Sequence, residues 1–511
     1  MERDGSLKSL WQEGHSNYIP NNVSDQGKTY DVVIAGGGIT GITTGLLLQK
    51  AGKSCLIIEA RNIGFGTTGG TTAHLNTLLD NPYTTYIKNF GEENARLVAK
   101  GAAQAISLVE KLVLEYKIHC GFERKSAYLI AKNEKQKKEL EDIETACRKV
   151  GLKIAGAKQI PAPIAFTKAI KVDDQAQFHP VDYIYAIAKE FENLGGAICE
   201  NCRVLEAENE DNLIEVKTTD GVFKCKNLVY ATHIPPGINI LDLKAAPYRS
   251  YAMAVRLKLG NYPDCLIYDL DQPFHYYRTQ NVNGRDYLIA GGCDHKTGHE
   301  PNTNKPFLAL ESDIKAGFDV EEVAFRWSSQ YYEPVDALPY IGLLPGFSKN
   351  IYVATGFSGN GMTFGSLAAI IFKELIVDGE SEYRKLFHPG RIKPIAGFAE
   401  FVKENADVTA KLFQTVLPKE RLEELAGLAP GEGSVVKFED KTIAIHKDEN
   451  GKIYALNPNC THLGCEVSFN IAERSWDCPC HGTRYDVTGR ILTAPATKPL
   501  ESLGSETEDK Q

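Results

Sequence analysis

The 511-residue sequence lacks any run of about 18 consecutive apolar residues, the length that a membrane-spanning helix needs. Its N-terminal stretch, MERDGSLKSLWQEGHSNYIP, also lacks the apolar core of a signal peptide. From these two absences we predict a cytoplasmic protein with no integral membrane segment.

The sequence also lacks an excess of positive charge, since its formal net charge is −9. This balance gives no support for binding to nucleic acid or to an anionic membrane. Any phosphate-bearing cofactor must therefore be held by local donors. The apolar content of 43% is ample for large cores, and a chain of 511 residues suits two or three domains.

One stretch near the C-terminal end, CTHLGCEVSFNIAERSWDCPCH, concentrates metal-ligating residues. It holds four of the twelve cysteines and two of the twelve histidines within 22 positions. A [2Fe-2S] cluster with two cysteines on one iron and two histidines on the other needs this set. We assign Cys460 and Cys478 to one iron, and His462 and His481 to the other.

Two other interpretations use the same residues: a zinc ion held by two cysteines and two histidines, and a plain disulfide loop. Zinc explains neither the second cysteine pair, Cys465 and Cys480, nor the C-P-C-H-G continuation. With the following G-T-R-Y-D-V-T-G-R, the stretch resembles the Rieske iron–sulfur domain of the cytochrome bc-complex type. The resemblance implies a disulfide between Cys465 and Cys480. It also implies hydrogen bonds from Thr483 and Tyr485 to sulfur atoms, which raise the cluster potential.

A second motif, YDVVIAGGGITGITTGLLLQKAGKSCLIIEAR from Tyr30, predicts a strand–helix–strand unit that binds a dinucleotide. Gly36 allows the tight turn, Gly38 lets the backbone meet a pyrophosphate, and Gly41 lets helix and strand pack closely. The helix N-terminus then presents free N–H groups to the phosphates. Glu59, at the end of the second strand, is placed to accept the ribose hydroxyls.

The next segment, RNIGFGTTGGTTAHLNT, resembles the flavin-contacting loop of the D-amino-acid oxidase superfamily, which includes glycine and sarcosine oxidases. The resemblance covers roughly residues 28–392 and implies FAD as the cofactor. In it a helix N-terminus after the segment NIYVATGFSGNG stabilises the anionic reduced flavin. The residues that motif and resemblance assign to FAD are Gly36, Gly38, Ile39, Thr40, Gly41, Glu59, Ala60, Arg61, Gly66, Thr67, Thr68, Thr71, Val204, Ala231, Thr232, Gly356, Gly359, Gly361, Met362 and Thr363.

The middle of the chain is predicted to form the part of the protein that binds the substrate. Residues 92–150 show helical spacing of apolar residues, and the runs after Pro247 alternate as strands of an antiparallel sheet do. In the superfamily this sheet is the substrate domain and covers one flavin face. His275, Tyr277 and Arg278 are candidates for facing the cavity.

Tyr331 stands where several amino-acid oxidases carry an arginine that clamps the substrate carboxylate, and it is the fourth catalytic candidate. Without the planar, bidentate fork of arginine, a simple amino-acid substrate is disfavoured. The sequence offers no evident catalytic base.

The predicted fold class is an α/β FAD-binding Rossmann-type domain with an antiparallel-sheet substrate domain, followed by a small all-β Rieske domain. The predicted order along the chain is an N-terminal arm (1–27), the flavin domain (28–395, with the inserted sheet at roughly 245–330), a helical linker (396–425), the Rieske domain (426–504) and a tail (505–511).

This combination predicts a dehydrogenase that oxidises an amine or an N-substituted amino compound by hydride transfer to FAD. One-electron transfer through the Rieske [2Fe-2S] cluster to an external carrier is predicted to follow. Histidine ligation sets the cluster potential at about −150 to +300 mV, which makes electron transfer from the reduced flavin to the cluster downhill. Three alternatives remain open. The cluster delivers electrons inward to the flavin, it serves as a redox sensor on an oxidase, or the protein is a Rieske-type oxygenase. The oxygenase needs a mononuclear iron, for which the loop residues Asp294, His295, His299 and Glu300 are weak candidates.

Overall fold

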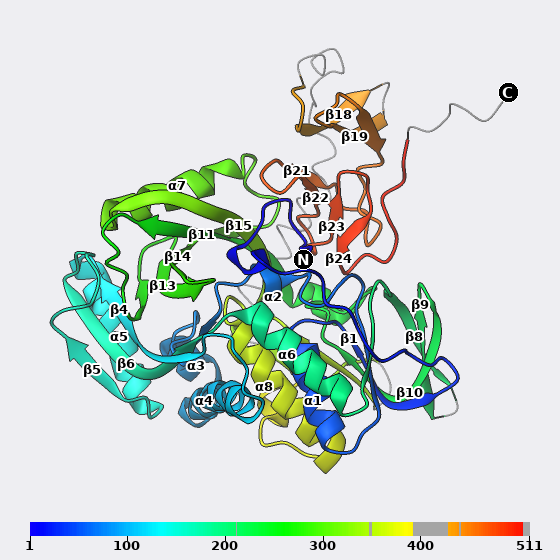
Figure 1. Cartoon of the computed structure of the whole chain (residues 1–511), viewed down its shortest axis with the longest axis horizontal. Coiled ribbons are helices and arrows are strands. Elements are labelled where there is room, and N and C mark those ends of the chain that lie inside the picture. Colours follow the sequence, from blue (N-terminus) through cyan, green and yellow to red (C-terminus); the bar gives the residue numbers. More distant parts are fainter. Residues whose placement is uncertain (211, 347–349, 392–427, 439–440, 504–511) are drawn as a thin grey trace.

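The computed structural model describes residues 1–210, 212–346, 350–391, 428–438 and 441–503. The predicted linker (396–425) and tail (505–511) lie outside these residues. The described chain forms one large body of helices and two sheets, and a smaller all-β part stands on it (Figure 1). Among the described helices, none combines the length and the apolar character needed to cross a membrane.

The first sheet is built around the parallel strands of the predicted dinucleotide unit. Its strands follow the order β16-β17-β10-β1-β2-β7, with β9 added antiparallel to β10 and β8 to β9. Val32, Val33 and Ile34 of β1 are fully buried, as strands covered on both faces must be. The strands are β1 (Thr29–Ala35), β2 (Cys55–Ile58), β7 (Ala197–Cys199), β8 (Val204–Glu210), β9 (Leu213–Thr218), β10 (Gly221–Tyr230), β16 (Tyr340–Leu343) and β17 (Ile351–Thr355).

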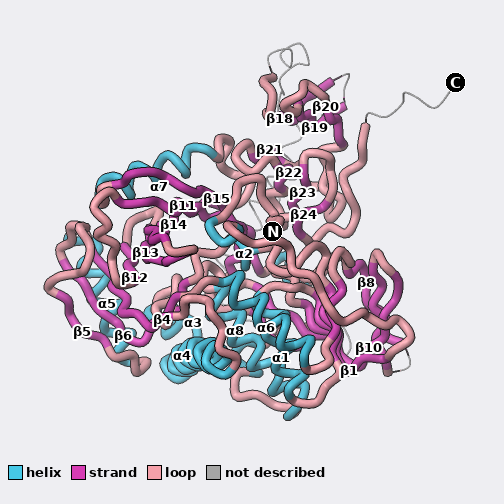
Figure 2. Tube along the Cα trace, in the orientation of Figure 1, coloured by secondary structure: helices cyan, strands magenta, loops and turns pink. Residues whose placement is uncertain are grey.

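Helices α1, α6 and α8 lie side by side next to this sheet (Figure 2). They carry the apolar faces that close its core, which includes Ile42, Phe191 and Leu367. The helical segments of the large body are η1 (Leu10–Gln12), α1 (Ile39–Lys50), α2 (Thr67–Gly70), α3 (Tyr83–Phe90), α4 (Glu92–Glu115), α5 (Glu134–Lys149), α6 (Pro180–Asn193), η2 (Ile240–Leu243), α7 (Asn304–Gly317), α8 (Gly361–Lys373), η3 (Glu374–Asp378) and α9 (Arg384–Phe387).

The second sheet is mostly antiparallel and follows the order β15-β11-β14-β13-β12-β4-β6-β3, with β5 paired to β6. It extends beyond the predicted 245–330 because four strands from residues 74–177 join it. Within 92–150, two helices form as expected, but β4 interrupts them: its pairing with β6 and β12 fixes the extended backbone. The strands are β3 (His74–Leu75), β4 (Glu123–Ala131), β5 (Ile154–Ala157), β6 (Lys168–Gln177), β11 (Ala245–Leu257), β12 (Leu266–Asp269), β13 (His275–Val282), β14 (Arg285–Lys296) and β15 (Val320–Pro334).

The C-terminal part contains two small antiparallel sheets and a core of its own. Trp476 and Tyr485 are fully buried in this core. The first sheet contains β18 (Gly433–Phe438), β19 (Lys441–Lys447) and β20 (Ile453–Leu456), and the second contains β21 (Ser468–Asn470), β22 (Ser475–Asp477), β23 (Arg484–Asp486) and β24 (Ile491–Thr493).

The N-terminal arm runs to the junction between the two parts, where Figure 1 shows the N-terminus. The Asp4 amide donates to the Phe65 carbonyl at 3.0 Å, and the Ser9 hydroxyl donates to the Gly69 carbonyl at 2.7 Å. The arm therefore packs against the Gly/Thr-rich loop that the sequence assigns to the flavin.

Buried charges join the arm, the second sheet and the C-terminal part; we call them the junction network, formed by Arg3, Asp4, Arg249, Glu473, Asp477 and Arg484. Asp477 accepts from Arg249 at 3.2 Å and from Arg484 at 3.1 Å. Arg484 also pairs with Asp4 at 3.1 Å. Three cations face three anions, so the network is balanced, as buried charges need to be.

Candidate functional site

The glycine-rich turn after β1 has two positions where a side chain would collide with the protein backbone. Gly36 has a φ of +113°, and a Cβ there would lie 2.4 Å from the Ala231 carbonyl oxygen. A Cβ on Gly41 would lie 1.9 Å from the Gly36 carbonyl oxygen. The predicted reasons for glycine at these positions, a tight turn and close packing of helix on strand, match this geometry.

Glu59 ends β2 beside this turn and is fixed by backbone donors. Its carboxylate accepts from the Gly37 amide at 2.7 Å and from the Arg61 amide at 2.9 Å. Burial raises the pKa of Glu59 although both hydrogen bonds favour its charged form. The side chain borders the cavity, where it can accept hydroxyl groups of a ribose.

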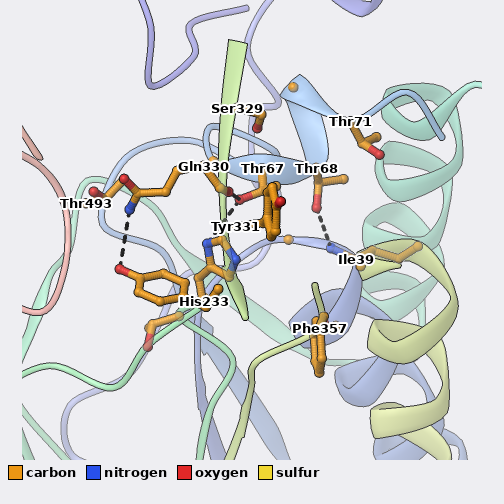
Figure 3. A pocket seen from close by; sticks show the side chains of 18 of the residues that line it. Ile39, Thr67, Thr68, Thr71, His233, Ser329, Gln330, Tyr331, Phe357 and Thr493 are labelled. Carbon is orange, nitrogen blue, oxygen red and sulfur yellow. Dashed lines mark hydrogen bonds between the residues drawn. The ribbon is translucent and has the colours of Figure 1, made fainter. Parts of the chain in front are cut away.

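One long cavity runs from this turn past the loop at residues 66–72 to the second sheet. The residues predicted to bind FAD line it, with four exceptions: Gly41, Arg61, Gly356 and Thr363. Thr363 lies directly behind the lining, where its hydroxyl accepts from the Asn76 amide at 3.2 Å. Figure 3 shows Thr67, Thr68 and Ile39 around the middle of the cavity, where the Ile39 amide donates to the Thr68 hydroxyl at 3.1 Å.

The second sheet closes the other end of the cavity with aromatic and acidic side chains. Tyr276, Asp294 and Tyr331 line it there, and the Tyr331 hydroxyl donates to Asp294 Oδ2 at 2.9 Å. Burial raises the pKa of Asp294 to about 7. Asp80 lies at the same end and accepts from the Gly359 amide at 2.7 Å.

Of the four catalytic candidates, the structure places Tyr331 in the cavity lining and the other three outside it. His275 pairs with Asp269 at 3.1 Å, and Tyr277 donates to Asp313 of α7. Arg278 is fully buried, and its guanidinium donates to the carbonyl oxygens of Ala73 and Phe178.

Sequence reasoning missed several lining residues that come from distant strands. Tyr276 lies between two of the candidates on β13, and alternation along the strand puts it on the opposite face from His275 and Tyr277. Arg278, the third candidate on β13, shares the face of Tyr276, so alternation from Arg278 would have found it. His74 lies in the predicted flavin-contacting segment, and His233 and Tyr332 directly follow predicted residues, but no spacing pattern singles out these three side chains.

The two cluster loops of the C-terminal part bring their thiols together. Cys465 and Cys480 form a disulfide, with 6.4 Å between their Cα atoms. Cys460 and Cys478 are buried, free thiols, and the Tyr485 hydroxyl lies 3.2 Å from Cys460 Sγ. A hydrogen bond from Cys478 lowers the pKa of Cys460 to about 6, which favours the thiolate that binds metal.

The two histidines face each other beside these thiols. The ring centroids of His462 and His481 are 4.9 Å apart, and burial lowers the pKa of His481 to about 4. Nδ1 of His462 and Nδ1 of His481 are buried and have no hydrogen-bond partner among the described residues, while Nε2 of His462 lies 3.4 Å from Asp242 Oδ2. Buried imidazole nitrogens without a partner fit metal ligation, so this donor set of two thiols and two imidazoles suits a [2Fe-2S] cluster.

A segment of the C-terminal part adjoins the long cavity. Residues 492–496, at the end of β24 and after it, contribute Leu492, Thr493, Ala494 and Ala496 to its lining. Figure 3 shows Thr493 at one edge and His233 between it and Thr67.

Two side chains connect the flavin loop to the cluster loop. Thr67 Oγ1 lies 3.2 Å from His233 Nδ1, and the His233 ring meets the Tyr332 ring at 4.8 Å between centroids. The Tyr332 hydroxyl then donates to the carbonyl of His481 at 3.1 Å. A short path of contacts thus joins the predicted flavin site to a predicted cluster ligand.

The candidate iron residues of the oxygenase alternative do not converge. In the described part of the chain, no three of Asp294, His295, His299 and Glu300 bring ligand atoms within 4.8 Å of one another, as a single iron needs. The four predicted cluster ligands form no such group either, but they are divided between two irons. Asp294 lines the cavity, whereas His295 Nε2 lies 2.8 Å from the Tyr251 hydroxyl.

A flavin-type cavity beside a cluster-type donor set defines a class of protein: an oxidoreductase that combines a dinucleotide cofactor with an iron–sulfur centre. Residues 31–375 match the family model described as FAD dependent oxidoreductase, and residues 420–504 match the Rieske [2Fe-2S] domain. The chain belongs to the FAD dependent oxidoreductase family and carries a C-terminal Rieske domain.

Similar proteins share one or both of these parts. The putative Rieske 2Fe-2S iron-sulfur protein YhfW of Bacillus subtilis is 32% identical over 475 residues, which cover 93% of each chain. The γ-glutamylputrescine oxidoreductase of Escherichia coli is 23% identical over 72% of this chain and 88% of its own length. Glycine oxidase from Geobacillus kaustophilus shares the fold at 19% identity and a TM-score of 0.58, covering 71% of this chain and 99% of its own.

These matches confirm the predicted fold class, both resemblances and both cofactors. The protein is an oxidoreductase that binds FAD and a [2Fe-2S] cluster. The predicted domain boundaries and the individual ligand assignments stay predictions, because no comparison tests them.

Proposed function

We propose that this protein is a dehydrogenase that oxidises an amine or N-substituted amino compound and passes the electrons singly to an external carrier. FAD, when bound, accepts a hydride, and the [2Fe-2S] cluster moves one electron at a time. The assignment of Cys460, Cys478, His462 and His481 as cluster ligands is part of this proposal. Action in the cytoplasm is a further prediction.

The observation that carries the proposal is that one cavity is lined by both domains. The loop 492–496 of the Rieske domain borders the cavity that also contains the glycine-rich turn and the flavin loop. Arg61 and Arg203 both donate to the Ile491 carbonyl, at 2.8 and 3.2 Å, which holds that loop against the nucleotide end. This arrangement supports electron transfer within one chain.

The residues of the chain have separate tasks in this proposal. The turn at Gly36 and the carboxylate of Glu59 would hold the nucleotide, and the first residues of α8, which line the cavity, would border the flavin. His233 and Tyr332 fill the space between flavin loop and cluster loop and exclude water from it. Asp294 and its neighbours form the place where the amine binds.

The test removes the cluster and keeps the flavin. In Cys478→Ser we expect FAD to remain bound and an amine to bleach it anaerobically at the wild-type rate. Reduction of cytochrome c, a one-electron acceptor, should fall at least about 100-fold, because flavin-to-acceptor transfer then lacks its carrier. Cys147→Ala, in helix α5 away from the cavity, serves as the matched control and should retain full activity.

Unchanged cytochrome c reduction in Cys478→Ser would contradict the proposal and favour the sensor alternative. A cluster midpoint potential well below that of the flavin would instead favour electron flow from an external donor into the flavin.

A further inference from the structure

The charges along the cavity are distributed unevenly between its two ends. Asp80 and Asp294 line the substrate end, and they interact electrostatically with each other. Among the lining residues, Arg203 carries the one permanent positive charge, and it lies at the nucleotide end beside Glu59. No lysine or arginine therefore meets the substrate end of the lining.

Asp294 presents one oxygen that lacks a donor. Its Oδ2 accepts from the Tyr331 hydroxyl at 2.9 Å, and the nearby Ser250 hydroxyl also favours the charged form of the carboxyl and lowers its pKa. Oδ1 is buried and makes no hydrogen bond of normal geometry among the described residues. A buried carboxylate oxygen without a donor is costly, and native proteins leave few such groups unsatisfied. A bound ligand that donates an N–H group would supply the missing partner.

Aromatic rings surround the same space. Tyr276 lies 5.4 Å from the His74 ring and 5.7 Å from the Phe274 ring, centroid to centroid, and Tyr268 lies 5.6 Å from His74. All four side chains line the cavity. The faces of aromatic rings attract cations, and carboxylates also pair with cations. The rings and the two aspartates of this end therefore both favour a positively charged ligand.

His74, which belongs to this group of rings, carries no positive charge that would repel a cationic ligand. Burial lowers the pKa of His74 well below 6.5, so its imidazole is neutral near pH 7. Arg278, which could have received a carboxylate, is held by the carbonyl oxygens of Ala73 and Phe178 and lies outside the lining. The substrate end thus favours positive charge and offers no partner for a carboxylate.

We propose that the substrate is an organic ammonium ion without a carboxylate next to its nitrogen, with Asp294 Oδ1 accepting its N–H and the tyrosine rings packing around it. This rests on the proposed amine oxidation and narrows its substrate class. It excludes α-amino acids, whose carboxylate would meet Asp80 and Asp294 instead of a cation.

The first test measures binding without turnover. Trimethylammonium chloride is titrated into the anaerobic holoenzyme, and the change in the visible spectrum of FAD gives its dissociation constant. We expect saturable binding that Asp294→Asn weakens by about 10- to 100-fold, the usual effect of losing a hydrogen bond to a charged group. Asp286→Asn, an exposed position on the same strand β14, is the control and should bind as the wild type does.

The second test needs no variant and so does not depend on folding of Asp294→Asn. Pentylamine and norleucine differ only by the α-carboxylate, and we expect pentylamine to bind more tightly to the wild-type holoenzyme. Norleucine binding as tightly or more tightly would overturn the proposal, and so would equal trimethylammonium affinity in the wild type and in an Asp294→Asn protein that retains both cofactors.

These outcomes are separable from the fate of the electron-transfer proposal. Cys478→Ser, which lacks the cluster, should bind trimethylammonium with unchanged affinity. Normal ammonium binding with no electron transfer to the cluster would reject the dehydrogenase proposal and leave the substrate class standing.

Discussion

Two buried polar regions of the molecule differ in how their carboxylates are paired. In the junction network, Asp477 accepts from Arg249, Arg484 and Asn470, so each of its oxygens has a donor, although Nε of Arg3 and of Arg249 lacks a partner among the described residues. At the substrate end, Asp294 is also buried but keeps one oxygen without a partner. The unpartnered oxygen of Asp294 belongs to a residue that lines the cavity, where a ligand can complete its hydrogen bonds.

The pKa values of the two carboxyl groups follow this difference. Despite its burial, the pKa of Asp477 is lowered to about 2, because the Arg484 and Arg249 guanidiniums stabilise its charge. Burial with no cation in contact raises the pKa of Asp294 to about 7. The carboxylate of Asp477 is therefore charged at neutral pH. A cation that binds beside Asp294 would lower the pKa of Asp294 and favour its charged form.

The largest effect should come from breaking the junction network. Arg484→Met leaves Asp477 with Arg249 as its remaining cation and Asp4 with Arg3, and losing one partner of a buried pair costs about 3–5 kcal/mol. We expect the free energy of unfolding of the holoenzyme, measured with chemical denaturant, to fall by that amount. The control is Arg490→Met, whose exposed pair with Asp486 should contribute less than about 1 kcal/mol. Equal losses in both variants would contradict the account.

The second prediction concerns pH at the substrate end. Below pH 7 the carboxyl of Asp294 is protonated and neutral, so affinity for trimethylammonium should rise about tenfold per pH unit toward pH 7 and then level off. Asp80 and Tyr331 face the group and His275 acts on it electrostatically, and Asp294→Asn should flatten the profile. Affinity that increases as the pH falls would be incompatible with this role.

A third prediction tests the contact between the flavin domain and the cluster loop. Asp242 Oδ2 lies 3.4 Å from Nε2 of His462, where its negative charge stabilises the oxidised cluster. Asp242→Asn should raise the cluster midpoint potential by on the order of 60 mV, the one-electron equivalent of a tenfold change. Redox titration followed by EPR measures it, with the exposed Glu501→Gln as control. A lower midpoint potential in Asp242→Asn would contradict the role of the Asp242 charge in stabilising the oxidised cluster.

The smallest effect is expected from Tyr331→Phe. Its hydroxyl donates to Asp294 Oδ2 and stabilises the carboxylate, so its loss should raise the pKa of Asp294 by about half to one unit. The midpoint of the trimethylammonium pH profile then moves upward by the same amount. Tyr248→Phe, whose ring stacks on Tyr331 at 5.9 Å but lies outside the cavity lining, should leave the midpoint in place.

The same contrast explains what the sequence could predict. The predicted cluster donors lie within 22 positions, and the dinucleotide turn is equally local, so spacing along the sequence predicts both. The substrate end draws Asp80, Asp294 and Tyr331 from segments far apart in the chain. On β13 the candidates His275, Tyr277 and Arg278 come from both faces of the strand, and nothing in the sequence tells that Tyr276, rather than these three, lines the cavity.

The junction network could not be predicted from the sequence either. Arg249, Glu473 and Arg484 look like surface residues until the arm, the second sheet and the Rieske domain bury them together. Only the tertiary arrangement reveals that their charges balance. β4 was missed for a related reason, because its partners β6 and β12 are distant in the chain.

The central claim is that electrons pass from the flavin to the cluster inside one chain, and it can be tested without knowing the substrate. The FAD of the anaerobic holoenzyme is photoreduced by a light flash with EDTA as donor, and flavin and cluster absorbance are followed over a dilution series. The account predicts that the cluster is reduced after the flavin at a rate independent of protein concentration. A cluster that stays oxidised, or a rate that scales with concentration, would contradict it.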